Sequence, residues 1–355
     1  MHKFAVFSGF LGSGKTTLMM ALTRYFEENH GKSAMISNDL GGPGLADHRL
    51  AKLSGCSASE LTGTCICYQT ENLVQRLRSL YENGCQLVVS DIPGFGVGAL
   101  EHVYHKLDRQ FPGQFPLAPF TVLCDPRSVA SAREGRDPDL DYILRSQLLE
   151  ADLIVLNKID LLDSDEKAEM ISYLKEHFPQ ARVLPVSALT GQGLEALSQA
   201  LIHHCASLRA PDLSYGGPRF LSAMGKISEY NIQYYAVVCC DSFDGTAYLR
   251  DLAQEIQALV AQVPGDIPHM KFLAWQPEGD YGKVDLLGIH QPLVTTKAFS
   301  GPCTELAVVL NASAFCPPDA LDALAGQALE TVSGNYNLTL TVYKKECFSA
   351  MGGSR

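Results

Sequence analysis

One short segment near the N-terminus restricts the fold of this chain more than any other. Residues 9–16 have the sequence Gly-Phe-Leu-Gly-Ser-Gly-Lys-Thr, which fits the phosphate-binding pattern G-x-x-x-x-G-K-[ST]. The apolar residues 4–7 before it predict a buried strand, and residues 17–28 after it have helical spacing. A strand, a glycine-rich loop and a helix in this order indicate a P-loop domain. The sequence therefore predicts a nucleoside triphosphate site in an α/β fold with a doubly wound, mostly parallel sheet.

The residue types of this loop suit a polyphosphate. Backbone N–H groups must point at the phosphates, and a glycine-rich turn lets the chain approach them closely. The N-terminus of the following helix adds its dipole, Lys15 adds a mobile positive charge, and Thr16 offers a hydroxyl to Mg²⁺. The predicted phosphate-binding residues are Gly9, Gly12, Ser13, Gly14, Lys15, Thr16 and Thr17.

A second motif downstream predicts that the base is guanine. Residues 152–156 are a strand-like run that leads into Asn-Lys-Ile-Asp at 157–160, and ligands collect at the carboxyl ends of parallel strands. The Asp160 carboxylate can accept both N1–H and the exocyclic amine of guanine, while Asn157 braces the loop and the Lys158 stem stacks on the ring. The tetrapeptide alone favours a solvated loop, but a P-loop at this distance favours guanine. A backbone N–H for the guanine oxygen is predicted from Ser187, Ala188 and Leu189.

Ligands for the metal and the γ-phosphate are predicted at the end of another strand. Residues 86–90 are a strand-like run that leads into Asp91 and, three residues later, Gly94. Asp91 can hold Mg²⁺ directly or through water, and the N–H of Gly94 can contact the γ-phosphate and register its loss. An ordinary exit from a strand is the alternative. The candidate catalytic residues are Lys15, Thr16, Asp91 and Gly94.

No residue is identified as a general base, because phosphoryl transfer depends mainly on positioning and charge stabilisation. We therefore expect slow intrinsic hydrolysis. Asn38 and Asp39 end the second predicted strand and are candidates for the first mobile loop.

Two cysteines, Cys65 and Cys67, stand just before a helix predicted from Glu71. At positions i and i+2 of an extended segment their side chains point the same way, so both thiolates can reach one soft metal ion. The nearby helix N-terminus is expected to lower the pKa of both thiols. Two small core residues in a turn are the alternative, which the residues alone favour.

Composition bounds the class of protein. The chain has 355 residues, of which 46% are hydrophobic, so it can bury a sizeable core and form two domains. A net charge of −11 argues against nucleic acid and anionic membranes as partners. No apolar run approaches the ~20 residues of a membrane span, and the first predicted strand leaves no room for a signal peptide. The 11 scattered cysteines suit reduced thiols, so we expect a cytoplasmic protein.

The order of predicted elements indicates two domains. In the first part, strands are predicted at 3–8, 33–37, 86–90, 120–124, 153–157 and 183–186, and helices at 15–29, 71–83, 140–150, 164–177 and 191–205. In the second, strands are predicted at 232–239, 269–275, 284–289, 304–310 and 336–343, and helices at 246–262 and 318–332. The second order, β-α-β-β-(β)-α-β, is compatible with a ferredoxin-like fold. The predicted bounds are 1–206 for the P-loop GTPase domain, 207–219 for a linker, 220–347 for a smaller α+β domain and 348–355 for a tail.

The chain resembles the CobW-like GTPases, which are related to the nickel-insertion GTPases of urease and hydrogenase. The resemblance lies in four elements that follow one another in the same order, residues 9–17, 38–41, 65–67 and 157–160, and it covers about residues 1–205. It implies a GTPase that uses GTP and Mg²⁺ and acts as a metallochaperone, delivering Zn²⁺, Co²⁺ or Ni²⁺ or serving cobalamin-dependent enzymes. The implied partners are guanine nucleotide and a client metalloenzyme or corrinoid protein. A homodimer closed around the nucleotide is compatible with the resemblance.

The chain departs from that family at the metal motif. Tyr68 stands where the third cysteine is usual, Gly42 stands where an acidic residue is usual, and Asp91 replaces the usual glutamate. Cys65, Cys67 and Asp39 therefore form a poorer tetrahedral set. Two hypotheses stay open: a GTP-driven metallochaperone, and a GTP-switched adaptor or activation chaperone, for example of a corrinoid enzyme, that binds no metal itself.

Overall fold

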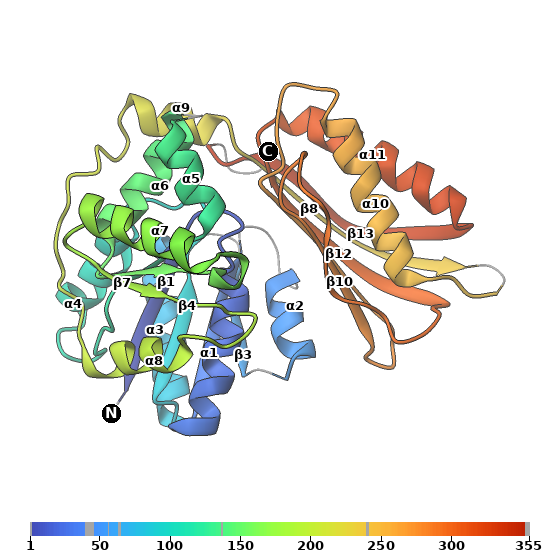
Figure 1. The fold of residues 1–355 in the computed structure, drawn as a ribbon. Helices are drawn as coiled ribbons and strands as arrows, with labels where there is room; N and C mark the ends of the chain where they lie inside the picture. The colour runs from blue at the N-terminus through green and yellow to red at the C-terminus, as the bar shows by residue number, and fades with distance from the viewer. Residues whose placement is uncertain are drawn as a thin grey trace. The chain divides into compact units, whose positions relative to one another are not determined.

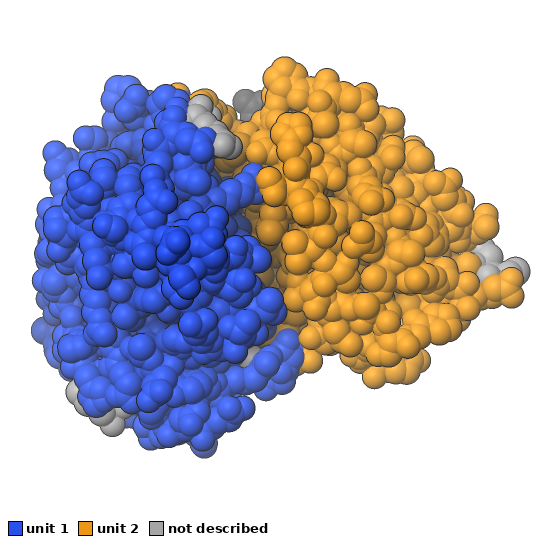
Figure 2. All heavy atoms as spheres, in the orientation of Figure 1, with its two compact units in different colours: residues 1–43, 54–220 blue, residues 44–53, 221–355 orange. Residues whose placement is uncertain are grey.

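The protein forms two compact units, which Figure 2 distinguishes by colour. The structure is a computed structural model and describes residues 2–39, 46–55, 57–62, 65–135, 138–238 and 241–351. The first unit comprises Met1–Pro43 and Ser54–Phe220, and the second comprises Gly44–Leu53 and Leu221–Arg355. The domain bounds predicted from the sequence stay a prediction.

The first unit is built on a parallel sheet of seven strands in the order β3-β2-β4-β1-β5-β6-β7 (Figure 1). β1 lies in the middle, where Phe7 pairs with Asp91 of β4 and with Thr121 of β5. All seven residues of β1 are buried, as expected for a strand covered on both faces. The strand bounds are β1 Lys3–Gly9, β2 Ser33–Asp39, β3 Ala58–Thr62, β4 Leu87–Asp91, β5 Thr121–Cys124, β6 Leu153–Leu156 and β7 Arg182–Pro185.

Helices connect these strands. α5 and α7 begin at capping boxes, in which Asp125 and Asp163 accept from backbone N–H groups of the first turn. By contrast, the N-cap of α1 is Gly14, which has no side chain to offer. The helices are α1 Lys15–Asn29, η1 Ile66–Tyr68, α3 Thr70–Glu82, η2 Leu100–His105, α4 Lys106–Gln110, α5 Pro126–Glu134, α6 Pro138–Glu150, η3 Ile159–Leu161, α7 Ser164–His177, α8 Leu194–His203 and α9 Pro218–Gly225.

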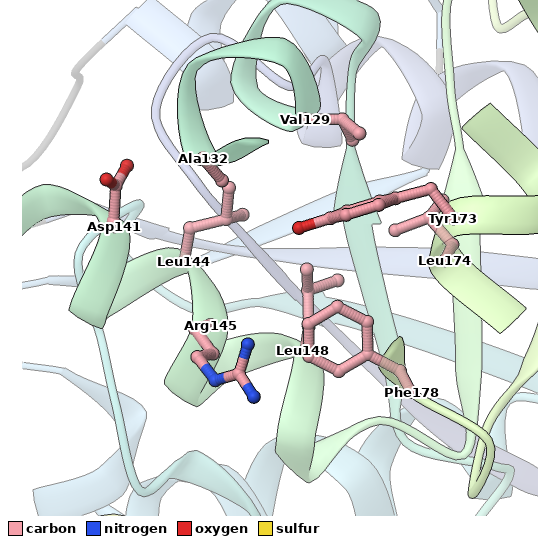
Figure 3. Close-up of a pocket in the computed structure, with 9 residues that line it drawn as sticks. All are labelled: Val129, Ala132, Asp141, Leu144, Arg145, Leu148, Tyr173, Leu174 and Phe178. Carbon is pink, nitrogen blue, oxygen red and sulfur yellow. The ribbon is translucent and has the colours of Figure 1, made fainter. Parts of the chain in front are cut away.

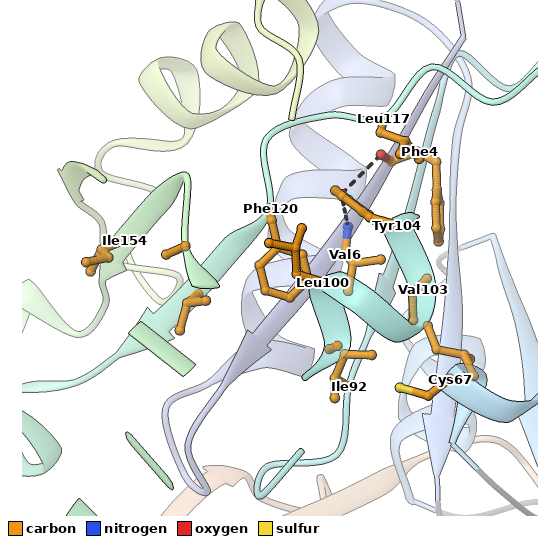
Figure 4. Packing of buried hydrophobic residues seen from close by; sticks show 14 of the residues in the cluster. Phe4, Val6, Cys67, Ile92, Leu100, Val103, Tyr104, Leu117, Phe120 and Ile154 are labelled. Atoms are coloured by element: carbon orange, nitrogen blue, oxygen red, sulfur yellow. Dashed lines mark hydrogen bonds between the residues drawn. The ribbon is translucent and has the colours of Figure 1, made fainter. Parts of the chain in front are cut away.

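Tyr104 joins the π-helical turn η2 to the central strand. Its ring is fully buried and packs edge-on against Phe120, with ring centroids 5.3 Å apart. Its hydroxyl accepts from the N–H of Val6 (3.0 Å) and donates to the carbonyl of Phe4 (3.4 Å), as Figure 4 shows. One side chain therefore holds η2 to β1 by both packing and hydrogen bonds.

The second unit is a six-stranded antiparallel sheet in the order β11-β10-β9-β12-β8-β13. The inner order β9-β12-β8-β13 is that of a ferredoxin-like sheet, so the predicted α+β fold is confirmed. α10 and α11 lie along one face of this sheet and share one apolar core with it (Figure 1). The bounds are β8 Ser228–Val238, α10 Gly245–Val260, β9 His269–Trp275, β10 Tyr281–Leu286, β11 Val294–Lys297, β12 Glu305–Ala314, α11 Pro318–Asn335 and β13 Leu338–Ser349.

Helix α2, Ala46–Leu53, belongs to the second unit although it lies between β2 and β3 in the sequence. The N–H of Ala46 donates to Oδ1 of Asn311 (2.8 Å). The ammonium of Lys271 contacts both carboxylate oxygens of Asp47 at 2.6 Å. Strands β12 and β9 therefore hold this helix through polar contacts.

The predicted parallel strands are all present, and the sequence analysis missed several further elements. β3 has the sequence Ala-Ser-Glu-Leu-Thr, which lacks an apolar run because it forms the edge of its sheet. α9 begins at Pro218, inside the segment predicted as a linker. The other missed elements are α2, η1, η2, α4, α5, η3 and β11. No helix within the described ranges combines the length and hydropathy needed to cross a bilayer.

Candidate functional site

The loop at 9–16 lies between β1 and α1, as predicted, and its glycines are sterically required. A Cβ on Gly9 would stand 2.3 Å from the carbonyl oxygen of Leu123, and one on Gly14 would stand 2.5 Å from Nδ2 of Asn157. Gly9, Gly12 and Gly14 all have positive φ angles, which other residues rarely adopt. The backbone therefore forms a tight loop at the carboxyl end of the central strand, which suits a phosphate group.

The polar side chains of this loop also suit an anion. Lys15 donates to the carbonyls of Gly9 (2.7 Å) and Phe10 (3.4 Å), so its ammonium lies over the loop. The hydroxyl of Ser13 is buried and has no hydrogen-bond partner, which indicates room for a ligand atom. Thr16 is buried in the first turn of α1, and Thr17 follows it. These residues fit a polyphosphate with Mg²⁺ on the Thr16 hydroxyl.

Asp91 and Asn38 connect the ends of two neighbouring strands. One carboxylate oxygen of Asp91 accepts from the backbone N–H of Asn38 (3.0 Å), and Asn38 Oδ1 accepts from the N–H of Ile66 (2.9 Å). The predicted Mg²⁺ ligand is thus two hydrogen bonds away from the segment that carries Cys65 and Cys67. The Asp39 side chain, which the sequence analysis included in the metal set, lies outside the described part.

Gly94 lies against the phosphate-binding loop. A Cβ at this position would stand 2.5 Å from Cδ2 of Leu11 and 3.1 Å from its Cα. Only a glycine lets the backbone approach the loop this closely. The structure therefore brings Gly94 to the loop that the sequence analysis associated with it.

Asn157 and Lys158 reach from the end of β6 to the phosphate-binding loop. Asn157 Nδ2 donates to the carbonyl of Ser13 (2.8 Å), and Lys158 Nζ donates to the carbonyl of Gly12 (2.6 Å). Lys158 also forms an ion pair with Asp125 (2.8 Å) and has a left-handed backbone, with φ of 62°. Asn157 therefore braces the two loops, as predicted from the sequence.

Asp160 is exposed next to the loop that follows β7. Its Oδ1 accepts from the Ser187 hydroxyl (2.5 Å), and the other carboxylate oxygen faces no protein donor among the contacts of the described residues. The N–H of Ala188 donates to Asn157 Oδ1 (3.0 Å), so it is already committed to the brace. Within residues 187–191, all of which are described, Leu189 alone has an N–H without a protein acceptor. Leu189 is therefore the better candidate donor to a base.

Cys65 and Cys67 lie close together, but they differ from the prediction in two ways. Cys67 lies within the 3₁₀ turn η1 rather than on an extended segment. The two sulfurs share a hydrogen bond at 2.9 Å, which lowers the pKa of Cys65 and raises that of Cys67; burial raises the pKa of Cys67 further. The expectation that both thiols have lowered pKa values is therefore wrong for Cys67. The Cys65 thiolate is stabilised by a hydrogen bond from Cys67, which must keep its proton to donate it.

Two sulfurs are a small donor set for a transition metal. Within the described residues, no group of three or more His, Cys, Asp or Glu side chains is placed to hold a metal ion. Two thiolates bound to one tetrahedral zinc at about 2.3 Å stand about 3.8 Å apart. The pair must therefore open before it can take up a metal as cargo. The donor type suits a soft ion, but the number of donors on the described residues does not complete a site.

Comparison with known families identifies the first part of the chain. Residues 3–185, about half of the chain, match the family described as CobW/HypB/UreG, nucleotide-binding domain. The chain belongs to this family. Membership agrees with the sequence resemblance and with the parallel sheet of the first unit.

Solved structures show weaker similarity. The hydrogenase maturation factor HypB from Archaeoglobus fulgidus is 18% identical, with a TM-score of 0.40, and the match covers 56% of this chain and 87% of HypB. HypB from Helicobacter pylori in complex with nickel is 20% identical, with a TM-score of 0.39, over 56% and 85%. Zn(II)-bound YjiA GTPase from E. coli is 15% identical, with a TM-score of 0.37, over 92% and 98%. At such scores the likeness supports no residue-level comparison, so the CobW/HypB/UreG assignment rests on the family match.

Several residues around the candidate site were missed in the sequence analysis. Lys106 Nζ donates to the carbonyl of Cys67 (2.7 Å), and its charge lowers the pKa of Cys65 further. Asp125 pairs with Lys158, and the sequence Asp-Pro after a strand is a typical helix N-cap that could have located it. Gln147 and Glu150 contact the segment after Asp91, and no sequence signal distinguishes them from other polar residues of α6.

A small pocket elsewhere in this domain is not part of the site. It lies between α5, α6 and α7, as Figure 3 shows. Apolar side chains and the stem of Arg145 line most of it, and none of its lining residues was predicted to bind nucleotide or metal. The lining residues are Val129, Ala132, Asp141, Leu144, Arg145, Leu148, Tyr173, Leu174 and Phe178.

Proposed function

We propose that this protein binds GTP with Mg²⁺, hydrolyses it slowly to GDP and phosphate, and uses this cycle to deliver a metal ion or metallocofactor to a client enzyme. The candidate cargoes are zinc, cobalt or cobalamin, and nickel. The described cysteines are all free thiols, which suits the reducing cytoplasm.

The position of Asn157 carries the nucleotide part of this proposal. One side chain hydrogen-bonds to Ser13 of the phosphate-binding loop and to Ala188 of the loop after β7. Asp160 and Leu189 therefore face the base of a nucleotide whose phosphates contact Gly9, Gly12 and Gly14. The free oxygen of Asp160 and the free N–H of Leu189 match the N–H groups and the carbonyl of guanine.

The magnesium and the γ-phosphate have candidate partners on the same edge of the sheet. Thr16 and Asp91 supply the oxygen ligands that Mg²⁺ prefers. Lys15 leaves its carbonyl contacts to neutralise phosphate charge, and Gly94 offers its N–H to the γ-phosphate. With Lys15, Thr16, Asp91 and Gly94 in these roles, catalysis consists of positioning and charge stabilisation.

The hydrogen-bonded path from Asp91 through Asn38 to Ile66 supports coupling to a cargo metal. Loss of the γ-phosphate changes the environment of Asp91, and the path transmits this change to Cys65 and Cys67. The thiol pair then opens or closes on a soft metal ion, with Asp39 as a further candidate ligand.

A matched substitution tests guanine recognition. Asp160→Asn removes the acceptor for two guanine donors and should cost roughly 1–3 kcal/mol of the preference for GTP over ATP. Xanthosine triphosphate has a carbonyl in place of the guanine amine, so its affinity should rise in the same variant. Binding is measured by isothermal titration calorimetry, with exposed Asp165→Asn as the control. Equal affinity of the wild type for GTP and ATP would refute guanine recognition.

An adaptor that binds no metal is the second candidate, and the mutual hydrogen bond of Cys65 and Cys67 without a third described ligand favours it. Metal content per chain should be measured after loading with Zn²⁺, Co²⁺ or Ni²⁺, with GDP and with a non-hydrolysable GTP analogue. A metallochaperone should bind metal in a nucleotide-dependent way that Cys65→Ser with Cys67→Ser abolishes. Unchanged metal content in that double variant would leave the adaptor as the function.

A further inference from the structure

Glu150, the last residue of α6, is a buried carboxylate directed at the loop that follows Asp91. Oε2 accepts from the N–H of Gly98 (2.9 Å) and Oε1 accepts from the N–H of Leu100 (2.8 Å). Only 1% of the residue surface is exposed. Burying a carboxylate is costly unless hydrogen bonds compensate it, so these two contacts fix the backbone between Gly98 and η2.

Gln147 holds the earlier part of the same loop. It stands one turn before Glu150, so both side chains leave the same face of α6. Its Nε2 donates to the carbonyls of Gly94 (3.2 Å) and Gly96 (2.9 Å), whereas its Oε1 is buried without a hydrogen-bond partner. The amide therefore contacts the loop through its donors, and both of its N–H groups are used.

These contacts hold the loop at the point where it meets the phosphate-binding loop. Gly94 packs so closely on Leu11 that a Cβ would overlap with it, and Gln147 binds the carbonyl of Gly94. Four hydrogen bonds from two side chains thus define the position of the residues from 94 to 100.

We propose that Gln147 and Glu150 are positioning residues for GTP hydrolysis, which hold the backbone of residues 94–100 so that the N–H of Gly94 meets the γ-phosphate. This inference rests on the proposed GTPase function. Neither residue touches the nucleotide; both act through the loop.

The four hydrogen bonds from Gln147 and Glu150 to residues 94–100 form a clamp on this loop, and the clamp depends on the protonation of Glu150. Burial raises the pKa of this carboxyl group to about 7, although the hydrogen bonds from Leu100 and Gly98 oppose the shift. The ionised form accepts from both N–H groups, whereas the protonated form turns one O–H toward a donor. Cys67, whose pKa Glu150 raises, and Arg209, which donates to the carbonyls on either side of Glu150, are the titratable and charged groups near it among the described residues. The clamp therefore weakens as pH falls below about 7.

Steady-state hydrolysis by the full-length protein tests this proposal. Glu150→Gln and Gln147→Leu should each lower kcat about 10- to 100-fold while KM for GTP and stoichiometric nucleotide binding stay unchanged. Exposed Glu176→Gln makes the same charge change on α7 and is the control. The wild-type kcat should rise with pH and level off above about 7, and this rise should be absent from Glu150→Gln. At each pH the kcat of the wild type is divided by that of Glu150→Gln, because titration of the nucleotide affects both proteins alike.

Each outcome decides the matter. If the wild type hydrolyses GTP but both variants retain its kcat and its pH profile, the positioning role is refuted and the GTPase function stands. If the wild type neither binds nor hydrolyses GTP, the proposed function fails and this inference fails with it. If Glu150→Gln does not fold, Gln147→Leu still decides, since a purely structural role would leave its kcat at full nucleotide occupancy unchanged.

Discussion

Gly14 shows how strongly single residues constrain this site. It is the N-cap of α1, its φ angle is +93°, and Nδ2 of Asn157 lies only 2.5 Å from the position that a Cβ would take. The same glycine therefore begins the helix, allows the tight turn of the phosphate-binding loop and leaves room for Asn157, which follows β6. Lys158, at the end of β6, also has a left-handed backbone conformation, which is energetically unfavourable for a residue other than glycine. Its contacts with Gly12 and Asp125 offset this cost.

We expect Gly14→Ala to weaken nucleotide binding by about tenfold or more, since the new methyl group displaces Asn157 in addition to a backbone cost of about 1–2 kcal/mol. Gly113→Ala is a matched control, because Gly113 also has a positive φ (+71°) but no atom within 4 Å of the added Cβ. Calorimetric titration with GTP measures both variants. Similar affinities in the two would contradict a role for the close approach to Asn157.

At the scale of elements, the parallel sheet places its strand ends where the site needs them. β1, β4 and β6 end in the phosphate-binding loop, in Asp91 and in Asn157, and helices behind the strands hold the connecting loops. The π-helical turn η2 is fixed at both ends, by Glu150 at Leu100 and by Tyr104 on β1. An irregular turn at this place is stable because side chains from other elements hold it.

Tyr104→Phe should lower the free energy of unfolding by about 1–3 kcal/mol, because it leaves the buried N–H of Val6 without its acceptor. Tyr81→Phe removes a hydroxyl that is also buried but makes no hydrogen bond, so it should be neutral or slightly stabilising. Urea denaturation followed by circular dichroism measures both. An equal loss of stability in the two variants would show that the hydrogen bond to β1 is not the reason.

At the scale of the whole molecule, the chain passes between the two units three times, after residues 43, 53 and 220. The helix between the first two crossings is held by the ion pair of Asp47 with Lys271 and by Asn311. A segment that lies between β2 and β3 in the sequence is therefore part of the second unit, where it has both these polar contacts and buried apolar residues, Ala46, Leu50 and Ala51.

Lys271→Met should destabilise the docking of α2 by about 3 kcal/mol, because it removes one partner of a buried ion pair. Hydrogen exchange in peptides that cover residues 46–53 should then become about 100-fold faster. Lys345→Met is the control, since it breaks a more exposed pair with Asp322 that contributes little. Adding Asp47→Asn to Lys271→Met should restore part of the protection; no restoration would mean that the ion pair is not what holds the helix.

The sequence by itself determined the parallel sheet, the loop at 9–16 and the motifs at 91–94 and 157–160, because short-range patterns specify a strand, a tight turn and the chemistry at its end. Only the tertiary structure decided which residues serve those motifs. Gln147 and Glu150 meet their partners across distant parts of the chain, and the pKa difference between Cys65 and Cys67 arises from a turn that the spacing of the two residues does not reveal. Hydrogen bonds between distant segments have no periodicity in the sequence, so they can be found only in the folded protein.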